Sequence, residues 1–249
     1  MNHALYNQLA GYYDRIYSRK NYKQEAEELR ELIRQHGLPD GINLLEVACG
    51  TGRYLEQFEE DFSCTGIDLS SAMLRVARKR LSKTKLRQAD MRTFDLGIEF
   101  DVVLCLFSSI ANLKSYRELK QAIKNMSKHL KPGGVFILGP WLHPGEFKPG
   151  GPRIFTYDSP DLKIARLDVP KQRENKSILD FHWTIAERNK PVRYIPRDHH
   201  ELVMFSPDQY FESMRLAGLN SRFLKPRAPD ANGLYLGTKD NSQNHRKHR

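Results

Sequence analysis

The chain has 249 residues, 39% of them hydrophobic, and a formal net charge of +10. This length fits one large domain or one domain with a substantial insertion, and the apolar content suffices for a buried core. No apolar run is long enough to cross a bilayer, and residues 1–6 lack the pattern of a secretory signal. Three cysteines, Cys49, Cys64 and Cys105, fall in predicted core strands, which favours small buried thiols in a reducing compartment. We therefore expect a cytoplasmic protein with no membrane partner.

Tyrosines are concentrated near the start of the chain, at Tyr6, Tyr12, Tyr13, Tyr17 and Tyr22. A tyrosine has an apolar face and a polar tip, which suits a lid packed over a bound ligand. Apolar residues at helical spacing predict a helix over residues 22–35, which a glycine and then a proline end. We expect these residues to form an N-terminal helical lid.

Residues 44–52 read Leu-Leu-Glu-Val-Ala-Cys-Gly-Thr-Gly, which predicts a buried parallel strand, a tight glycine turn and a helix over residues 53–60. Gly50 and Gly52 allow a sharp turn and a close approach of a ligand to the backbone. The next strand ends at Asp68, whose carboxylate can accept hydrogen bonds from ribose hydroxyls. The dinucleotide fingerprint needs a third glycine where Leu55 stands, and no Gly-Lys-Ser/Thr follows, so both of those nucleotide motifs fit poorly.

Strands and helices continue to alternate after Asp68. We expect a helix over residues 70–81 capped by a serine, strands over 85–88, 100–107 and 135–138, a helix over 116–129 and a turn over 131–134. This alternation predicts a parallel sheet, in which ligands bind at the carboxyl ends of the strands. The residues at such ends are Gly50, Asp68, Asp90, Ser108 and Trp141. Asp90 also fits a simple Asx turn.

The alternation stops after Trp141. Extended runs over residues 153–157, 163–169, 178–186 and 192–205, separated by turn residues that include 171–175, predict an antiparallel insertion of about four strands over the mouth of the site. A helix over 207–217 and strands over 219–224 and 233–238 complete the main sheet. We thus expect residues 1–140 and 206–240 to form the main domain, 141–205 the insertion, and 241–249 a basic disordered tail.

The run from Glu46 to Gly52 resembles the first motif of class I S-adenosylmethionine-dependent methyltransferases, and Asp68 stands where that family places its ribose acid. The resemblance covers nearly the whole chain. It implies an α/β fold with a Rossmann-like seven-stranded sheet, helices on both faces, and the β insertion between strand 5 and the last helix. Asp90 would reach the adenine amino group of S-adenosylmethionine. The implied cofactor-binding residues are Tyr13, Tyr22, Ala48, Gly50, Gly52, Asp68, Leu69, Met73, Asp90, Met91 and Phe107.

Residues 107–110, residues 140–150 and the Tyr13-Asp14 pair with Tyr22 resemble the TDP-3-amino-sugar N,N-dimethyltransferases of macrolide deoxysugar pathways. In that family the insertion forms the sugar-nucleotide pocket and part of a subunit contact, which implies a homodimer through the insertion. Asn112 stands where those enzymes usually have histidine, and an asparagine cannot take a proton from an amine. The implied substrate-binding residues are Tyr13, Asn112, Trp141 and Phe147. His182 and His200 lie in the predicted insertion strands, so either is a further candidate to face the acceptor, and each also fits a surface or core histidine. The catalytic candidates are Tyr13, Asn112 and His200.

We therefore expect methyl transfer from S-adenosylmethionine to a small-molecule amine, such as an amino-sugar nucleotide. Holding donor and acceptor in line supplies much of the catalysis, and a strong general base is not essential. No metal is expected, because the nine histidines show no ligand spacing with cysteines or acids.

Two alternatives stay open. The charge of +10 favours an RNA methyltransferase, although neither an RNA-binding module nor an Asn/Asp-Pro-Pro-aromatic motif is present. A non-catalytic cofactor-binding protein is the other alternative, against which the intact set of Gly50, Gly52, Asp68 and Asp90 argues.

Overall fold

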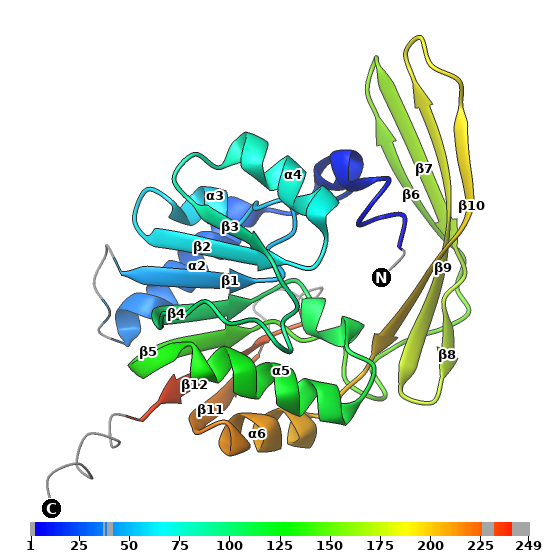
Figure 1. Cartoon of the computed structure of the whole chain (residues 1–249). Coiled ribbons are helices and arrows are strands. Elements are labelled where there is room, and N and C mark those ends of the chain that lie inside the picture. The colour runs from blue at the N-terminus through cyan, green and yellow to red at the C-terminus, as the bar shows by residue number, and fades with distance from the viewer. Residues whose placement is uncertain (1–2, 37, 39–41, 226–231, 241–249) are drawn as a thin grey trace, which may run out of the picture.

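The computed structural model describes residues 3–36, 38, 42–225 and 232–240. A seven-stranded sheet, in the order β11-β12-β5-β4-β1-β2-β3, faces a separate antiparallel sheet across a gap (Figure 1). The strands from β5 to β3 in this order are parallel, and β12 runs antiparallel to both of its neighbours. The strands are β1 Asn43–Val47, β2 Ser63–Asp68, β3 Lys85–Gln88, β4 Phe100–Cys105, β5 Leu130–Leu138, β11 Leu219–Leu224 and β12 Leu234–Lys239.

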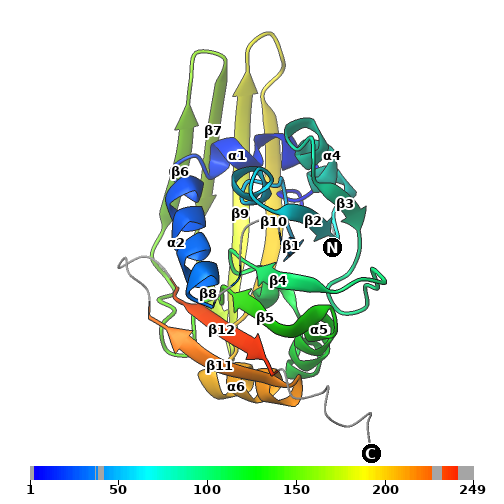
Figure 2. The ribbon, with the colours of Figure 1, turned by 90° about the vertical axis from the view of Figure 1, so that its left-hand side faces the viewer.

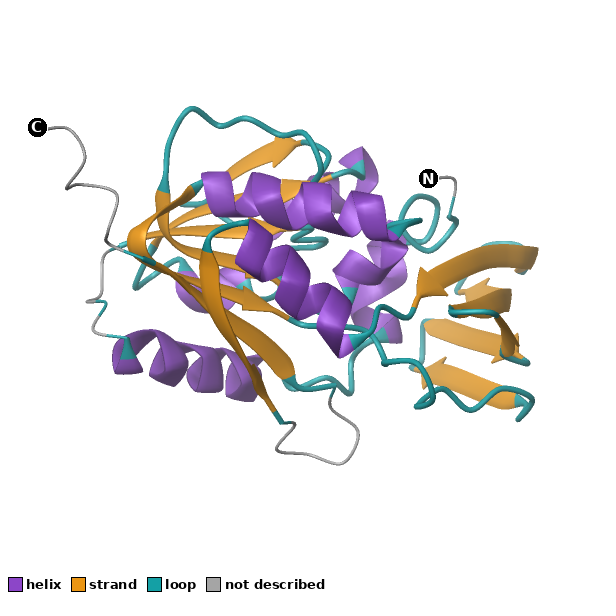
Figure 3. Ribbon diagram, turned by 90° about the horizontal axis from the view of Figure 1, so that it is seen from below, coloured by secondary structure: helices purple, strands orange, loops and turns teal. Residues whose placement is uncertain are grey.

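Helices cover both faces of the large sheet, so its central strands are buried on both sides (Figure 3). Leu44 joins a core with α2, α3 and α4, while its neighbour Leu45 joins the opposite core with α5 and α6. This arrangement confirms the expected Rossmann-like α/β fold. No helix in the described ranges is long and apolar enough to cross a membrane. The helices are α2 Tyr22–Gln35, α3 Leu55–Phe58, α4 Ser71–Arg80, α5 Tyr116–Lys128 and α6 Pro207–Leu216.

Three local predictions were wrong. The helix expected over residues 53–60 is only α3, Leu55–Phe58, because the chain must already enter β2 at Ser63. The turn expected over 131–134 lies inside β5, because Leu130 pairs with Phe100 and a bulge then shifts the register. The turn expected over 171–175 begins with a short strand, β8 Lys171–Arg173, that pairs with β9. In the last two cases, the turn-forming residue types did not reveal that the segment pairs with a neighbouring strand.

The second sheet contains the expected strands in the order β10-β9-β7-β6, and a short fifth strand, β8, pairs with β9. Alternate side chains of β9, including Phe181 and Trp183, are buried, while those between them, such as His182, are exposed, as the two-residue period of a strand requires. Figure 2 shows this sheet standing along one side of the large sheet. Its strands are β6 Arg153–Asp158, β7 Leu162–Asp168, β8 Lys171–Arg173, β9 Lys176–Glu187 and β10 Arg193–Val203.

The N-terminal segment, residues 3–17, lies between the two sheets and includes η1 Ala10–Tyr12 and α1 Tyr13–Ile16 (Figure 1). Asp198 of β10 accepts hydrogen bonds from the backbone N–H groups of Ala4 and Leu5, at 2.8 and 3.0 Å. On the other side, Thr51 donates to Asp14 at 2.6 Å. The segment is therefore attached to both sheets. The expected basic tail, 241–249, lies outside the described residues.

Candidate active site

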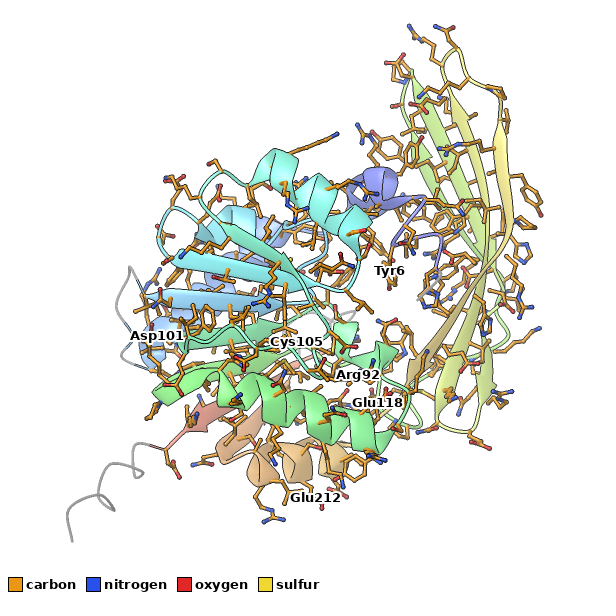
Figure 4. All side chains as sticks on the ribbon, viewed as in Figure 1. Tyr6, Arg92, Asp101, Cys105, Glu118 and Glu212 are labelled. Carbon is orange, nitrogen blue, oxygen red and sulfur yellow. The ribbon has the colours of Figure 1, made fainter. Side chains whose placement is uncertain are left out.

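A cavity of about 590 Å³ opens between the carboxyl ends of the parallel strands and the buried face of the second sheet. Its walls come from the turn after β1, the ends of β2 to β4, the N-terminal segment, and strands β6, β7, β9 and β10. Figure 4 shows Tyr6 in the gap between the two sheets. The cavity thus has two ends, which we call the cofactor end, at the parallel strands, and the acceptor end, at the second sheet.

The cofactor end is built around Gly50 and Asp68. Gly50 has a φ of +56°, and among the described residues no heavy atom lies within 4 Å of the position that a Cβ would occupy. Its N–H donates to Oδ2 of Asp68 at 2.8 Å, and the N–H of Ser70 donates to Oδ1 at 2.7 Å. Burial raises the pKa of Asp68, and these two donors act in the opposite direction. A carboxylate beside an open glycine turn suits the ribose of a nucleoside.

Asp90 forms the Asx turn and an ion pair at the same time. Its Oδ1 accepts the N–H of Arg92 at 2.8 Å, and the guanidinium of Arg92 bridges Asp90 and Glu118, each at 2.6 Å. Hydrogen bonding to Arg92 holds the pKa of Asp90 below its usual value. Figure 4 shows Arg92 beside Glu118. Asp90 therefore lines the cavity as a fixed carboxylate, next to Met91.

Aromatic rings enclose the middle of the cavity. Tyr17 packs edge-on against Phe107, with ring centroids 5.1 Å apart, and lies 4.7 Å from the ring of Tyr13. Tyr6 lies 6.3 Å from Tyr13. Burial raises the pKa of all three tyrosines, so their phenols stay neutral at neutral pH. Electron-rich ring faces of this kind attract a cation such as a sulfonium.

The acceptor end carries polar and basic groups. Trp141 donates its indole N–H to Ser177 Oγ at 2.9 Å, and the Asn112 amide donates to the Ser109 carbonyl at 3.2 Å. The guanidinium of Arg166 lies 4.4 Å from the ring centre of Phe181. Arg153, Lys114 and His200 line the same end.

The structure brings most of the predicted site residues together. Those lining the cavity are Tyr13, Ala48, Gly50, Asp68, Leu69, Met73, Asp90, Met91, Phe107, Asn112, Trp141 and His200.

Four predicted residues do not line it. Tyr22 packs against the ring of Tyr54 at 5.0 Å, and Phe147 is buried in the apolar core of the second sheet. A Cβ on Gly52 would come within 2.6 Å of Leu81, so this glycine serves packing between turn and helix. His182 is exposed because the alternation along β9 points its neighbours inward.

Several cavity residues escaped the sequence reasoning. Tyr6 and Tyr17 belong to the tyrosine cluster that predicted a lid, so a signal for them was present. Arg92, Arg153 and Arg166 gave none, because arginines on strands and turns are usually solvated and only the fold directs these three into one cavity.

His3, Asp198 and His200 place three nitrogen or oxygen donors within 4.8 Å of one another. Both oxygens of Asp198 already accept hydrogen bonds, from Ala4, Leu5 and, at 3.3 Å, the indole of Trp183. These contacts make the group an anchor for the N-terminal segment.

The profile of a methyltransferase domain family matches residues 44–134. The chain is 36% identical, over 88% of its length and 91% of the relative, to the dTDP-3-amino-3,4,6-trideoxy-alpha-D-glucopyranose N,N-dimethyltransferase of Streptomyces venezuelae. It is 32% identical, over 92% of its length and 90% of the relative, to the dTDP-3-amino-3,6-dideoxy-alpha-D-glucopyranose N,N-dimethyltransferase of Streptomyces fradiae.

Solved structures resemble the fold closely. Streptomyces venezuelae DesVI superposes with a TM-score of 0.81 at 35% identity, covering 88% of this chain and 92% of that one. An amino pentose methyltransferase from Micromonospora echinaspora, solved with S-adenosylmethionine bound, gives a TM-score of 0.79 at 33% identity with the same coverage.

Proposed function

The chain belongs to the methyltransferase family that includes the dTDP-amino-sugar N,N-dimethyltransferases, and we propose that it methylates the amine of a nucleotide-linked amino sugar with S-adenosylmethionine. The relatives support the reaction, since their names specify N,N-dimethylation of dTDP-amino sugars. The two ends of the cavity support the division into a methyl donor site and an acceptor site.

The cofactor end fits S-adenosylmethionine. Asp68 would hold the ribose hydroxyls, Asp90 and Met91 would contact the adenine, and the open space at Gly50 would take the methionine part. The aromatic rings of Tyr13 and Phe107 would face the positive charge. When bound, this cofactor supplies a methyl group on a sulfonium, which is already a good electrophile.

The observation that carries the acceptor class is the unneutralised positive charge at the acceptor end. Arg153 donates to Asp168 Oδ2 at 2.9 Å, while Arg166 lies 3.4 Å from Oδ1 of the same carboxylate. The buried Nε of Arg166 has no hydrogen-bond partner in the described residues. Two guanidinium groups therefore share one carboxylate, so Asp168 neutralises the positive charge of this pair only in part. Arginine is well suited to phosphate oxygens, which favours an acceptor that carries a diphosphate.

The N-terminal segment supplies the remaining requirement, a water-poor site. It lines the cavity beside the aromatic rings, where the neutral amine would attack the methyl carbon in line with the departing sulfur. Orientation of two bound reactants in this way supplies a large part of the barrier reduction.

The test is turnover of labelled S-adenosylmethionine with a panel of acceptors: dTDP-3-amino and dTDP-4-amino sugars, the same amino sugars without nucleotide, and RNA. We expect dimethylated product from a nucleotide sugar. Transfer to the free sugar with equal efficiency, or to RNA alone, would contradict the proposal. Arg166→Gln should raise KM for the nucleotide sugar and leave cofactor affinity unchanged, with Arg188→Gln, an exposed arginine, as the matched control.

We also propose a homodimer through the second sheet. Ile154 and Leu167 are paired across β6 and β7 and are 69% and 50% exposed. Val169 follows β7, whereas Val192 precedes β10 and Tyr194 lies in β10, the strand at the opposite edge of this sheet; all three are largely exposed. Exposed apolar side chains on one sheet suit a protein interface. Light scattering should give the mass of a dimer, and Leu167→Glu should give a monomer.

A further inference from the structure

We propose that His200 accepts the proton that the acceptor amine must lose, and that Asp198 completes this group only while the N-terminal segment is closed over the cavity. The inference rests on the proposed function. Amine methylation needs such an acceptor in every round: after transfer the nitrogen carries an extra proton, and a second methyl cannot be added until that proton has left.

His200 is the only histidine among the described residues that line the cavity. The other titratable groups there are already engaged. Asp68 accepts backbone N–H groups, and Asp90 and Glu118 are paired with Arg92. Burial raises the pKa of the cavity tyrosines, and an asparagine amide is not basic. Histidine is the side chain whose ordinary pKa permits proton uptake near neutral pH.

Asp198 prepares His200 for this role. Its Oδ2 lies 3.0 Å from Nε2 of His200, an electrostatic contact that is not aligned as a hydrogen bond. Burial acts to raise the pKa of Asp198, but His200 and the N–H groups of Leu5 and Ala4 outweigh it and hold the pKa below its usual value. Asp198 is therefore an anion, and a proton taken up by the ring of His200 would lie beside its carboxylate. Because Nε2 faces Asp198, Nδ1 is the atom left for the amine proton.

The same carboxylate fixes the N-terminal segment. Asp198 accepts the N–H groups of Ala4 and Leu5, and the ring of His3 stacks on the ring of His200 at 4.3 Å. Opening the segment would remove all three contacts at once and leave Asp198 open to solvent. Closure of the cavity and preparation of the proton acceptor are thus one event.

The other charged and titratable groups near His200 do not compete for the proton. Burial, followed by the charge of His200, lowers the pKa of His3 to about 4, so His3 is neutral at neutral pH. Tyr6 lies edge-on to His200 at 5.6 Å and stays protonated. Lys114 lies 3.4 Å from the carbonyl of Glu201, the next residue of β10, and its charge contributes to the lowered pKa of His3.

The nitrogen lone pair forms the new N–C bond, and the C–S bond breaks with its electron pair remaining on sulfur. The proton of the resulting ammonium passes to Nδ1 of His200 and leaves to solvent when the segment opens. The neutral secondary amine can then receive the second methyl group.

The first test compares His200→Gln with His199→Gln, using the dTDP-3-amino sugar of the Streptomyces fradiae relative as acceptor. His199 is the next residue of β10 and is paired with Asp180 and Glu201 at 2.6 and 3.4 Å. We expect His200→Gln to bind S-adenosylmethionine normally, to lose roughly 100-fold in kcat at neutral pH, to recover as pH rises, and to accumulate monomethyl product. His199→Gln should behave as the wild type. A folded His200→Gln with the wild-type pH profile would overturn the proposal.

The second test needs only the wild-type enzyme and decides the question if His200→Gln does not fold. The acid limb of kcat is measured with acceptors whose amines differ in pKa. If kcat falls at the same acidic pH for every acceptor, the titrating group belongs to the enzyme, which supports the proposal. If that pH changes with the pKa of the acceptor amine, the proposal is overturned. If the wild type methylates no nucleotide sugar, the proposed function itself has failed, which is a different outcome from an active enzyme without a His200 effect.

Asp198→Asn tests the positioning role. Its acid limb should move to lower pH, because the imidazolium loses its anion, and the amides of Ala4 and Leu5 should exchange faster with deuterium. A variant in which exchange rises while the pH profile stays unchanged would show that Asp198 only anchors the segment, and would overturn the coupling.

Discussion

The two ends of the cavity are built in opposite ways. The cofactor end comes from the carboxyl ends of the parallel strands, within residues 48–109, and its charged groups are mainly carboxylates. The acceptor end is assembled from residues 5–17, 112–114, 141 and 153–202, and carries Arg153, Arg166 and His200. A site at the ends of the central parallel strands keeps its geometry, while an appended sheet can vary, so we propose that the main domain selects the methyl donor and the insertion selects the acceptor.

The electrostatics of the two ends also differ. At the cofactor end, Asp68 and Asp90 are each fixed by hydrogen bonds, which suits hydroxyl and amino groups of a neutral nucleoside. At the acceptor end, Arg153 and Arg166 share Asp168, which suits an anion. Under the proposed function, this contrast would direct the two substrates to opposite ends of one cavity, with the aromatic rings between them.

The largest effect should come from Gly50→Val at the cofactor end. A β-branched residue is strained at the φ of +56°, and its side chain would enter the space left for the cofactor. We expect a folded protein without measurable S-adenosylmethionine binding in calorimetry. Gly97→Val is the matched control, since Gly97 also has a positive φ, +67°, and open space but lies outside the cavity. Equal loss of S-adenosylmethionine binding in both variants would show that backbone strain, and not a side chain in the cofactor site, causes the loss.

Asp68→Ala should weaken cofactor binding by roughly two decades, because a charge-assisted pair of hydrogen bonds to the ribose is lost. Acceptor KM should change far less, as the acceptor end is untouched. Asp101→Ala is the control, because Asp101 accepts the N–H of Asn43 at 2.9 Å near the amino ends of the parallel strands, away from the cavity (Figure 4). Unchanged affinity in a folded Asp68→Ala would remove Asp68 from the cofactor site.

Trp141→Ala should act at the acceptor end alone and raise the acceptor KM by about tenfold. Trp141 follows β5, lines the cavity and is only half-buried, whereas Trp183 of β9 is fully buried. Trp183→Ala should therefore lower the free energy of unfolding by about 3–5 kcal/mol. Kinetics and thermal melts on both variants separate the roles. A Trp141→Ala protein as unstable as Trp183→Ala, with normal kinetics, would place Trp141 in the core.

The smallest effect concerns Glu46, a buried acid of β1 at the cofactor end. Burial, followed by the charge of Asp68, raises the pKa of Glu46 well above its usual value, and its Oε2 has no partner in the described residues. Protonated Glu46 contributes its full share to the free energy of unfolding below about pH 4.5. This contribution is lost as the pH rises toward the pKa of Glu46 in the folded state.

Glu46→Gln, which stays neutral, should therefore match the wild type in acid and exceed it at pH 8, by about 2–4 °C in Tm for each kcal/mol gained. Glu60→Gln at the surface should show no such trend. A Tm difference independent of pH would mean that Glu46 is not titrating between the two states.

The sequence by itself determined the cofactor end. The glycine turn, the strand ending at Asp68 and the alternation of strands and helices are local patterns, and the edge of a parallel sheet collects whatever follows its strands. Gly50, Asp68 and Asp90 therefore reached the cavity as predicted.

Only the tertiary structure decided the acceptor end. The alternation along β9 placed His182 outside, and long-range contacts brought the N-terminal segment to Asp198, 194 positions away from Ala4. The register of an antiparallel strand and the docking of a lid depend on contacts between distant residues, for which a single sequence carries no local signal.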